Sequence, residues 1–415
     1  MKARLSASQL ASLADQYQTP YWVYDASVIR AQIARLRAFD VIRFAQKACS
    51  NIHILQLMRE EGVLVDSVSL GEVERALAAG FDPLAQADHA PIVFTADVLD
   101  QAAIQRVTEL NIPVNCGSPQ MLEQLGKARP GHPVWLRINP GFGHGHSRKT
   151  NTGGEQSKHG IWHSNLDQAL AIIDQYGLQL QGLHMHIGSG VDYSHLQAVG
   201  NAMVAQVKSL GRDLKAISVG GGLSIPYRDG EAEVDTDHYF TVWQAARREI
   251  EAHLGHAISM EIEPGRFLVA ESGLLVAELR AQKQAGNNFF ALVDAGFNDL
   301  ARPAMYGSYH RISVCTRDGQ ERTGALQPTV VAGPLCESGD VFTQEDGGVV
   351  TTQNLPAAEI GDLLVFHDAG AYGASMSSNY NSRPLLPEIL VEQDQVKLIR
   401  RRQTIQELIA LETGI

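Results

Sequence analysis

Apolar runs and amphipathic helical segments alternate eight times between about residue 40 and about residue 265 of this 415-residue chain. The runs that we expect to form strands cover residues 42–46, 64–68, 91–95, 112–115, 133–139, 180–187, 215–219 and 258–263. Each intervening helix carries the chain back to the start of the next strand, so the strands should lie parallel. Eight such units predict a closed α/β TIM barrel, and an open doubly wound sheet is the alternative.

The pattern changes after residue 270, where short β-rich runs are separated by Gly, Pro and Asp turns. These runs indicate a second, all-β domain of the barrel or sandwich type. The strand-like segment at residues 21–25 is expected to pair with that later sheet. The predicted organisation is an N-terminal segment at 1–25, a barrel domain at 26–270, and a C-terminal β domain with a closing helix at 271–415.

Composition is typical of a soluble enzyme. The net charge of −12 disfavours a nucleic-acid partner or an anionic membrane surface. No apolar stretch approaches transmembrane length, and the start of the chain lacks a hydrophobic signal segment. The four cysteines are widely spaced and form no Cys-x-x-Cys pair, which favours a reducing compartment. We therefore expect a cytoplasmic protein that acts on a small molecule.

Lys47 directly follows the first predicted barrel strand, where the chain turns into a helix. The chemistry of a TIM barrel lies at the carboxyl ends of its strands, so this lysine should point into the barrel mouth. A lysine there can form an imine with a carbonyl cofactor once its ammonium group loses a proton. Most lysines are solvated surface charges, so the assignment depends on the other strand ends.

Two glycine-bearing loops follow the seventh and eighth predicted strands, at Gly220-Gly221-Gly222 and at Gly265-Arg266. Glycine lets backbone N–H groups approach an anion closely, and these two loops form the usual phosphate site of TIM barrels. A lone triple glycine is more simply interpreted as a tight turn. Two such loops after these two strands favour a phosphate site.

Glu263 ends the eighth predicted strand, and His184 and His186 share one face of the sixth. A carboxylate in the barrel mouth requires a cationic partner, and the protonated nitrogen of a pyridine ring would be one. A salt bridge to Arg137 or Arg266 is the alternative. An imidazole from the sixth strand could stack on such a planar ring.

A metal-dependent TIM-barrel hydrolase is the competing hypothesis from a different class. Its candidate ligands are the histidines His144, His146, His159, His163, His184 and His186. The first two lie in a polar loop at 140–158, for which a flexible lid is the preferred interpretation. This hypothesis leaves Lys47, the glycine loops and Glu263 unexplained, so no metal is expected. A non-catalytic cofactor carrier would use those three features but no proton donor.

Short segments in a fixed order then point to a known family. They are residues 44–48, 66–72, 184–189, 220–223, 263–266, 294–306, 333–340, 370–373 and 375–381. In this order and spacing the chain resembles the fold-type III pyridoxal-phosphate-dependent decarboxylases, whose barrel is like that of alanine racemase. Within that family it most resembles the enzymes that convert meso-2,6-diaminopimelate to L-lysine and carbon dioxide, the last step of bacterial lysine biosynthesis.

The resemblance implies a carboxy-lyase with pyridoxal 5′-phosphate held by Lys47, His186 stacked on the ring and Glu263 bonded to the ring nitrogen. The implied cofactor contacts also include Ser189, Gly221, Gly222, Gly265, Arg266 and Tyr372. Cys336 would donate a proton to the product. The implied substrate contacts are Arg266, Arg302, Tyr306, Glu337 and Tyr372. A homodimer with shared active sites is also implied, in which Cys336 and Glu337 come from the partner subunit.

Three residues depart from the family pattern, although none is assigned a chemical role. Cys49 stands where Asn is frequent, His159 where Phe is usual, and Gly190 where Gln often follows. Within the family, a decarboxylase of ornithine, arginine or carboxynorspermidine is the alternative. The substrate-contact segments favour diaminopimelate, because a forked arginine such as Arg302 suits a second carboxylate.

Overall fold

The computed structural model describes residues 2–3, 5–143, 152–186, 188, 190, 193–393 and 395–413. The chain divides into two compact units. The barrel unit consists of Ile33–Ser224 and Glu233–Phe267, and the β unit consists of Met1–Gln32, Ile225–Ala232 and Leu268–Ile415. Three of the candidate residues, Ser189, His144 and His146, lie outside the described residues.

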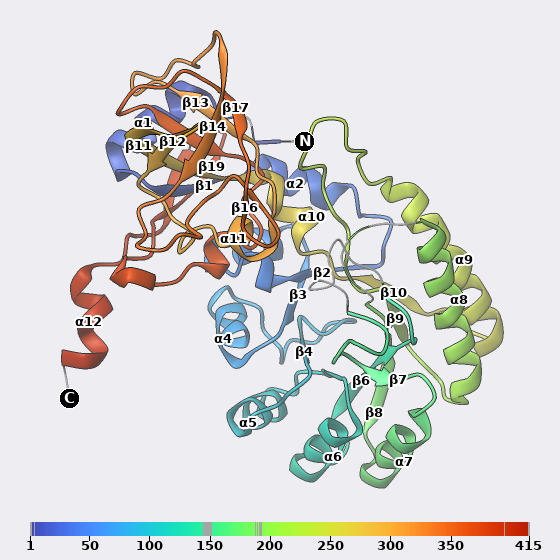
Figure 1. The fold of residues 1–415 in the computed structure, drawn as a ribbon. Helices are drawn as coiled ribbons and strands as arrows, with labels where there is room; N and C mark the ends of the chain where they lie inside the picture. Colours follow the sequence, from blue (N-terminus) through green and yellow to red (C-terminus); the bar gives the residue numbers. More distant parts are fainter. Residues whose placement is uncertain are drawn as a thin grey trace. The chain divides into compact units, whose positions relative to one another are not determined.

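The barrel unit contains a closed ring of eight parallel strands (Figure 1). They are β2 (Val41–Ala45), β3 (Leu64–Ser67), β4 (Ile92–Ala96), β5 (Val114–Cys116), β6 (Pro133–Asn139), β8 (Gln179–His184), β9 (Ala216–Ser218) and β10 (Ser259–Ile262). The ring closes because β10 pairs in parallel with β2, and β7 (Ile161–Trp162) pairs in parallel with the end of β6. The predicted TIM barrel is therefore confirmed.

Helices follow the barrel strands and surround the ring (Figure 1). They are α3 (Ile52–Glu60), α4 (Leu70–Ala78), α5 (Gln101–Glu109), α6 (Pro119–Ala128), α7 (Leu166–Tyr176), α8 (Tyr193–Leu210) and α9 (Thr236–Leu254). Helix α2 (Ala26–Ala34) comes before β2 in the chain, and most of it belongs to the β unit. The side chains of Ser69, Asp100 and Ser118 each accept a hydrogen bond from the N–H three residues later. These N-caps satisfy otherwise unpaired donors, so each helix begins within a few residues of its strand.

A buried ion pair occupies the barrel interior. Nε of Arg43 lies 3.0 Å from Oε2 of Glu261, and the two side chains are only 1% and 4% exposed. A second guanidinium nitrogen of Arg43 donates to the carbonyl of Ala90 at 2.9 Å. Alternate residues of a strand share a face, so Glu261 lies one layer below Glu263 in the barrel. The pairing compensates charges that would be costly to bury alone.

The β unit is organised around a nine-stranded sheet that includes the N-terminal strand. Its strands are β1 (Tyr21–Asp25), β11 (Gly273–Ala285), β12 (Asn288–Val293), β13 (Ile312–Cys315), β14 (Leu326–Ala332), β17 (Gln353–Pro356), β18 (Leu363–Phe366), β19 (Glu388–Glu392) and β20 (Gln395–Arg400). Strand β1 pairs antiparallel with β11 and parallel with β19. The predicted second, all-β domain is confirmed.

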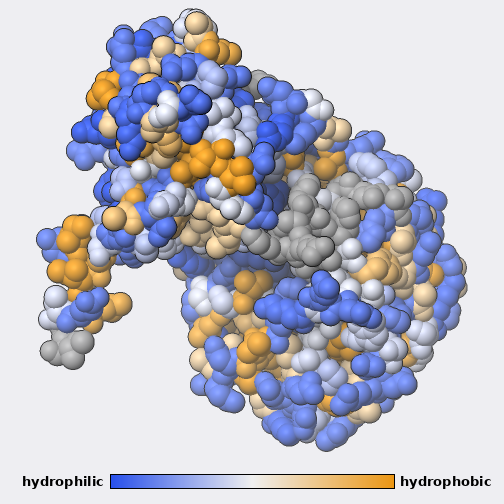
Figure 2. Space-filling model, in the orientation of Figure 1, coloured by the Kyte–Doolittle hydropathy of each residue, from blue (hydrophilic) through white to orange (hydrophobic). Residues whose placement is uncertain are grey.

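The β unit also contains short elements and a terminal helix. These are α1 (Ala7–Tyr17), η3 (Ala270–Ser272), α11 (Arg302–Tyr306), β15 (Gln344–Glu345), β16 (Val349–Val350), η4 (Ala374–Met376), η5 (Tyr380–Ser382) and α12 (Ile405–Thr413). Helix α12 has no buried residue, and its exposed Ile405, Ile409 and Leu411 contribute the hydrophobic surface at the lower left of Figure 2. Among the described residues, every helix is too short or too polar to cross a bilayer.

Candidate active site

Lys47 lies in the short helix η1 (Gln46–Ala48), directly after β2 and at the carboxyl end of the barrel. Its side chain is exposed, whereas the neighbouring Gln46 is buried. The Gln46 amide nitrogen donates to Oγ of Ser67 at 2.6 Å and to the carbonyl of Glu72 at 3.1 Å. These hydrogen bonds tie η1 to the end of β3 and to α4, so the backbone of Lys47 is held at the barrel mouth.

Two carboxyl groups lie within electrostatic reach of Lys47. Burial raises the pKa of Asp66, the negative charge of Glu263 raises it further, and the Lys47 charge opposes this rise. Burial also raises the pKa of Glu72, whose carboxylate accepts the N–H of Val68 at 2.8 Å. The side chain of Lys47 therefore interacts electrostatically with the carboxyl groups of Asp66 and Glu72.

Glu263 lies just beyond β10 and accepts two hydrogen bonds from neighbouring strand ends. Nε2 of His184 lies 2.8 Å from its Oε2, and Oγ of Ser218 donates to its Oε1 at 2.7 Å. Burial raises the pKa of this carboxyl group, but His184 and Ser218 outweigh burial and hold the pKa below its usual range. Glu263 is therefore an anion, and its oxygens can accept a further hydrogen bond.

The ring of His186 is fixed at one nitrogen. Its Nδ1 accepts the N–H of Gly221 at 3.1 Å, so the proton of the neutral ring lies on Nε2. Burial lowers the pKa of His186 well below its ordinary value, and the positive charges of Arg137 and Lys47 lower it further. The side chain is thus a neutral planar ring at the barrel mouth.

The triple-glycine loop packs directly against the neighbouring strand ends. A Cβ atom at Gly221 would lie 2.3 Å from the carbonyl oxygen of Glu263, and one at Gly222 would lie 2.4 Å from that of Gly188. Gly220 and Gly222 also have φ angles of +66° and +103°. Only glycine meets both demands, which leaves this stretch of backbone without side chains at the barrel mouth.

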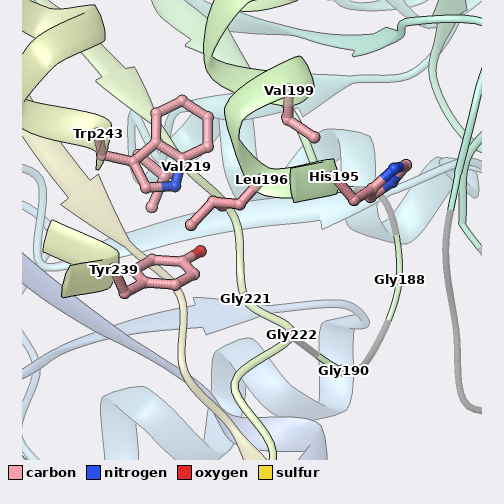
Figure 3. Close-up of a pocket in the computed structure, with 10 residues that line it drawn as sticks. All are labelled: Gly188, Gly190, His195, Leu196, Val199, Val219, Gly221, Gly222, Tyr239 and Trp243. Atoms are coloured by element: carbon pink, nitrogen blue, oxygen red, sulfur yellow. The ribbon is translucent and has the colours of Figure 1, made fainter. Parts of the chain in front are cut away.

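Behind this loop lies a small pocket whose other walls come from α8 and α9 (Figure 3). Figure 3 shows Leu196 and Val199 on α8, with Tyr239 and Trp243 on the opposite side. Its volume of ≈ 30 Å³ has room for about one water molecule. The pocket is too small for a cofactor ring.

The glycine-bearing loop after β10, at Gly265-Arg266, packs against the residues on either side of Lys47. The N–H of Ala45 donates to the carbonyl of Pro264 at 3.1 Å, and a Cβ at Gly265 would lie 3.2 Å from Ala48. Arg266 begins α10 (Arg266–Val269). Glycine at this position therefore lets the loop after β10 pack against the segment that carries the lysine.

Three of the described candidate histidines each have a partner other than a metal ion. Among the residues that the structure describes, no three His, Cys, Asp or Glu side chains are placed to share a metal ion. The ring of His184 contacts Glu263, that of His186 accepts from Gly221, and that of His159 pairs with Asp97. The metal hypothesis thus finds no ligand set in the described part of the barrel.

In the β unit, Cys336 and Glu337 lie in an exposed turn that Asp340 organises. One oxygen of Asp340 accepts the N–H of Leu335 and the other accepts that of Phe297, both at 2.7 Å. The N–H of Cys336 donates to the side chain of Asn381 at 2.9 Å. The Cys336 thiol is exposed on a turn that several hydrogen bonds hold in place.

Arg302 and Tyr306 are the two ends of α11, and Arg302 is only 5% exposed. The Arg302 guanidinium lies over the ring of Tyr227, 4.9 Å from its centroid, and Nη1 lies 2.9 Å from Nε2 of His310. Nδ1 of His310 in turn lies 2.9 Å from the carbonyl of His367, so that nitrogen carries the ring proton. Stacking and hydrogen bonding together fix the orientation of this guanidinium.

Tyr372 adopts an unusual backbone conformation in the β unit. Its φ is +57°, which is rare for a residue other than glycine. The preceding Gly370 packs so tightly that a Cβ there would lie 2.0 Å from the carbonyl of Val269. Residues such as Asn111 and Gln393 have a similar φ, so this conformation by itself assigns Tyr372 no role.

The barrel mouth fits pyridoxal phosphate by the chemistry of its own residues. Lys47 could supply an amine for the carbonyl group, and anionic Glu263 would suit a protonated ring nitrogen. The neutral ring of His186 offers a stacking face, and the two glycine loops leave backbone unshielded for a phosphate. The sequence pattern does not predict the contact between His184 and Glu263, because it offers His184 chiefly as a candidate metal ligand.

Comparison with known proteins agrees with this geometry. Residues 25–270 match the family described as pyridoxal-dependent decarboxylase, pyridoxal binding domain. Diaminopimelate decarboxylase of Escherichia coli (strain K12) is 65% identical over 409 residues, which cover 98% of this chain and 97% of that protein. The Streptomyces coelicolor diaminopimelate decarboxylase is also 65% identical, over 98% of this chain and 92% of its own length.

Solved structures give the same result. A crystal structure of diaminopimelate decarboxylase aligns with a TM-score of 0.95 at 65% identity, covering 98% of this chain and 96% of that one. The Helicobacter pylori diaminopimelate decarboxylase complexed with L-lysine aligns with a TM-score of 0.85 at 31% identity, covering 97% and 99%.

The barrel and its mouth are those of a pyridoxal-phosphate enzyme of the decarboxylase class. Within that class, the chain belongs to the diaminopimelate decarboxylase family.

Proposed function

We propose that this protein removes carbon dioxide from meso-2,6-diaminopimelate to give L-lysine, the last step of lysine biosynthesis. The observation that carries the proposal is the set of Lys47, His186 and anionic Glu263 around one barrel mouth, in a chain that is 65% identical to diaminopimelate decarboxylases over 98% of its length. When bound, pyridoxal phosphate supplies an acceptor for the electrons that carbon dioxide leaves behind.

Each side chain at the barrel mouth has a distinct part in this proposal. Lys47 would hold the cofactor through its side-chain amine, close to where the amino group of the substrate would bind. Glu263 would hold a proton on the ring nitrogen, and the neutral ring of His186 would offer a stacking face. The phosphate would be held by Gly221, Gly222, Gly265 and Arg266, and Ser189 and Tyr372 would be further cofactor contacts.

Residues of the β unit supply the substrate contacts and the proton. Arg302 and Tyr306 bind the distal carboxylate, with Arg266, Glu337 and Tyr372 as further substrate contacts. A planar guanidinium that is already oriented by Tyr227 and His310 loses little rotamer freedom when it binds a carboxylate. Cys336 returns a proton to the carbon that loses carbon dioxide.

The active sites belong to a homodimer, with Cys336 and Glu337 of each site coming from the partner subunit. The exposure of both side chains agrees with this arrangement. A two-fold interface uses each such segment twice and so builds two equivalent sites. All four cysteines are free thiols, which supports a cytoplasmic location.

Carbon dioxide release from a panel of amino acids tests the proposal. Purified protein reconstituted with pyridoxal phosphate should release carbon dioxide from meso-diaminopimelate and form lysine in equal amount. Ornithine, arginine and carboxynorspermidine should react far more slowly. Preferential turnover of any of these three would replace the proposal by the alternative within the family.

A further inference from the structure

Asn139, the last residue of β6, ties together two segments of chain at the barrel mouth. Its side-chain oxygen accepts the N–H of Gly141 at 3.1 Å and the N–H of Gly154 at 2.9 Å. Its side-chain nitrogen donates to the carbonyl of Gly154 at 3.1 Å. Asn139 is only 3% exposed, so these three hydrogen bonds form a buried clamp between Gly141 and Gly154.

The clamped segment reaches the histidine of the site. Two residues before Gly154, the hydroxyl of Thr152 donates to the carbonyl oxygen of His186 at 2.9 Å. Gly153 lies between them, and a Cβ there would lie 2.2 Å from the carbonyl of Phe142. The two segments are thus packed backbone against backbone, which leaves Thr152 little room to shift.

His186 is consequently held at two points. Thr152 fixes its backbone carbonyl, and the N–H of Gly221 fixes Nδ1 of its ring. The peptide group sets where the side chain starts, while the ring contact sets its rotation. Gly220 also packs closely against His186, since a Cβ at Gly220 would lie 2.9 Å from the Cα of His186. The Thr152 bond adds a fixed position for the carbonyl group, so the ring presents its face in one orientation.

We propose that Asn139 and Thr152 are positioning residues that set the height and tilt of the His186 ring against the cofactor ring. Asn139 acts through Thr152, and Thr152 acts through the carbonyl of His186. The inference rests on the proposed stacking role of His186, and it assigns a task to two polar residues that have no other part in the site. Stacking depends on ring separation and offset, so a shifted ring should hold the cofactor less well.

The test compares Thr152→Val with Thr152→Ser. Valine keeps the shape of threonine but loses the donor, whereas serine keeps the hydroxyl. Thr108→Val is the matched control, because it removes an equivalent bond, from the Thr108 hydroxyl to the carbonyl of Ile104 at 2.7 Å, on helix α5. The readouts are the visible circular dichroism of bound pyridoxal phosphate and the rate at which the holoenzyme loses it on dilution.

Thr152→Val should lose the cofactor about three- to tenfold faster and show an altered visible dichroism band, the effect expected for one hydrogen bond. Thr152→Ser and Thr108→Val should match the unmodified protein. Asn139→Asp keeps the oxygen that accepts from Gly141 and Gly154 but replaces the donor to the carbonyl of Gly154 by a second oxygen. This variant should change the same band, and it carries the test if Thr152→Val does not fold.

Unchanged dichroism and cofactor release in Thr152→Val, or equal losses in Thr152→Val and Thr152→Ser, would overturn the inference. Failure of the unmodified protein to bind pyridoxal phosphate would instead overturn the proposed function itself. The two failures are therefore distinguished by the first measurement on the unmodified chain.

Discussion

Oε2 of Glu263 lies 2.8 Å from Nε2 of His184, although Glu263 follows β10 and His184 ends β8. The contact keeps the carboxylate charged in a place where burial alone would favour its neutral form. A charged carboxylate at this point can hold a proton on the ring nitrogen of the cofactor, which is the condition for strong electron withdrawal. The position of His184 in the barrel therefore sets the charge of Glu263.

Glu263→Gln should keep the shape of the side chain but remove its charge. We expect kcat/KM for meso-diaminopimelate to fall by about 10²–10³-fold, the scale of losing one preorganised electrostatic contact. The protein should still bind pyridoxal phosphate through Lys47. Glu249→Gln, on the exposed face of α9, is the control and should retain full activity. Unchanged kcat/KM in Glu263→Gln would show that the carboxylate does not act on the ring nitrogen.

Asp66 should give the stability of the apoprotein a recognisable pH dependence. Burial raises its pKa, and the charge of Glu263 raises it further. The folded pKa lies above the unfolded value of about 4, so the folded state loses stability as pH rises through the interval between them. Asp66→Asn removes this titration.

The measurement is the free energy of unfolding by urea at about pH 5 and about pH 8. The unmodified protein should lose more stability over this range than Asp66→Asn does. Asp88→Asn, at an exposed position, should follow the unmodified protein. The same pH dependence in Asp66→Asn and in the unmodified protein would mean that Asp66 is not the titrating group.

Arg302→Ala tests the contact with the distal carboxylate. Loss of a charge-assisted contact should cost about 2–4 kcal/mol in kcat/KM for meso-diaminopimelate, because a charged end of the substrate is left unpaired. The visible absorbance of the bound cofactor should remain. Arg280→Ala, on the exposed part of β11, is the matched control. Full kcat/KM in Arg302→Ala would remove Arg302 from the substrate site.

Complementation between two inactive variants tests the shared active site. Mixed dimers of Lys47→Ala and Cys336→Ala contain one site in which both residues are intact. Random mixing should restore up to about a quarter of the unmodified activity, because half the dimers are mixed and each has one complete site. Co-purification through two different tags must establish that subunits have exchanged. Verified mixed dimers without activity would mean that each site draws both residues from one subunit.

The sequence predicted the barrel well because buried parallel strands appear as separate apolar runs. Strand β3 was expected at 64–68 and is Leu64–Ser67, and β6 was expected at 133–139 and is Pro133–Asn139. Strand β8 ends at His184 instead of residue 187. Gly188 follows soon after with a φ of +131°, which is incompatible with a continued strand.

Contacts between strand ends were less predictable than the strands. Periodicity shows that Glu263 and His184 both end strands, but it does not show which side chains meet across the barrel mouth. The same holds for Gln46 and Asn139, whose hydrogen bonds go to backbone atoms distant in sequence. Such contacts depend on the register of the closed barrel, which no local pattern encodes.

Borohydride reduction tests the central claim, that Lys47 carries the cofactor. Protein purified with pyridoxal phosphate should show a visible absorbance band that borohydride abolishes, because reduction makes the carbon–nitrogen link permanent. Peptide mass spectrometry should then find the reduced cofactor on the peptide that contains Lys47, and Lys47→Ala should give no such adduct. An adduct on a different lysine, or a protein that stays colourless after incubation with the cofactor, would contradict the account.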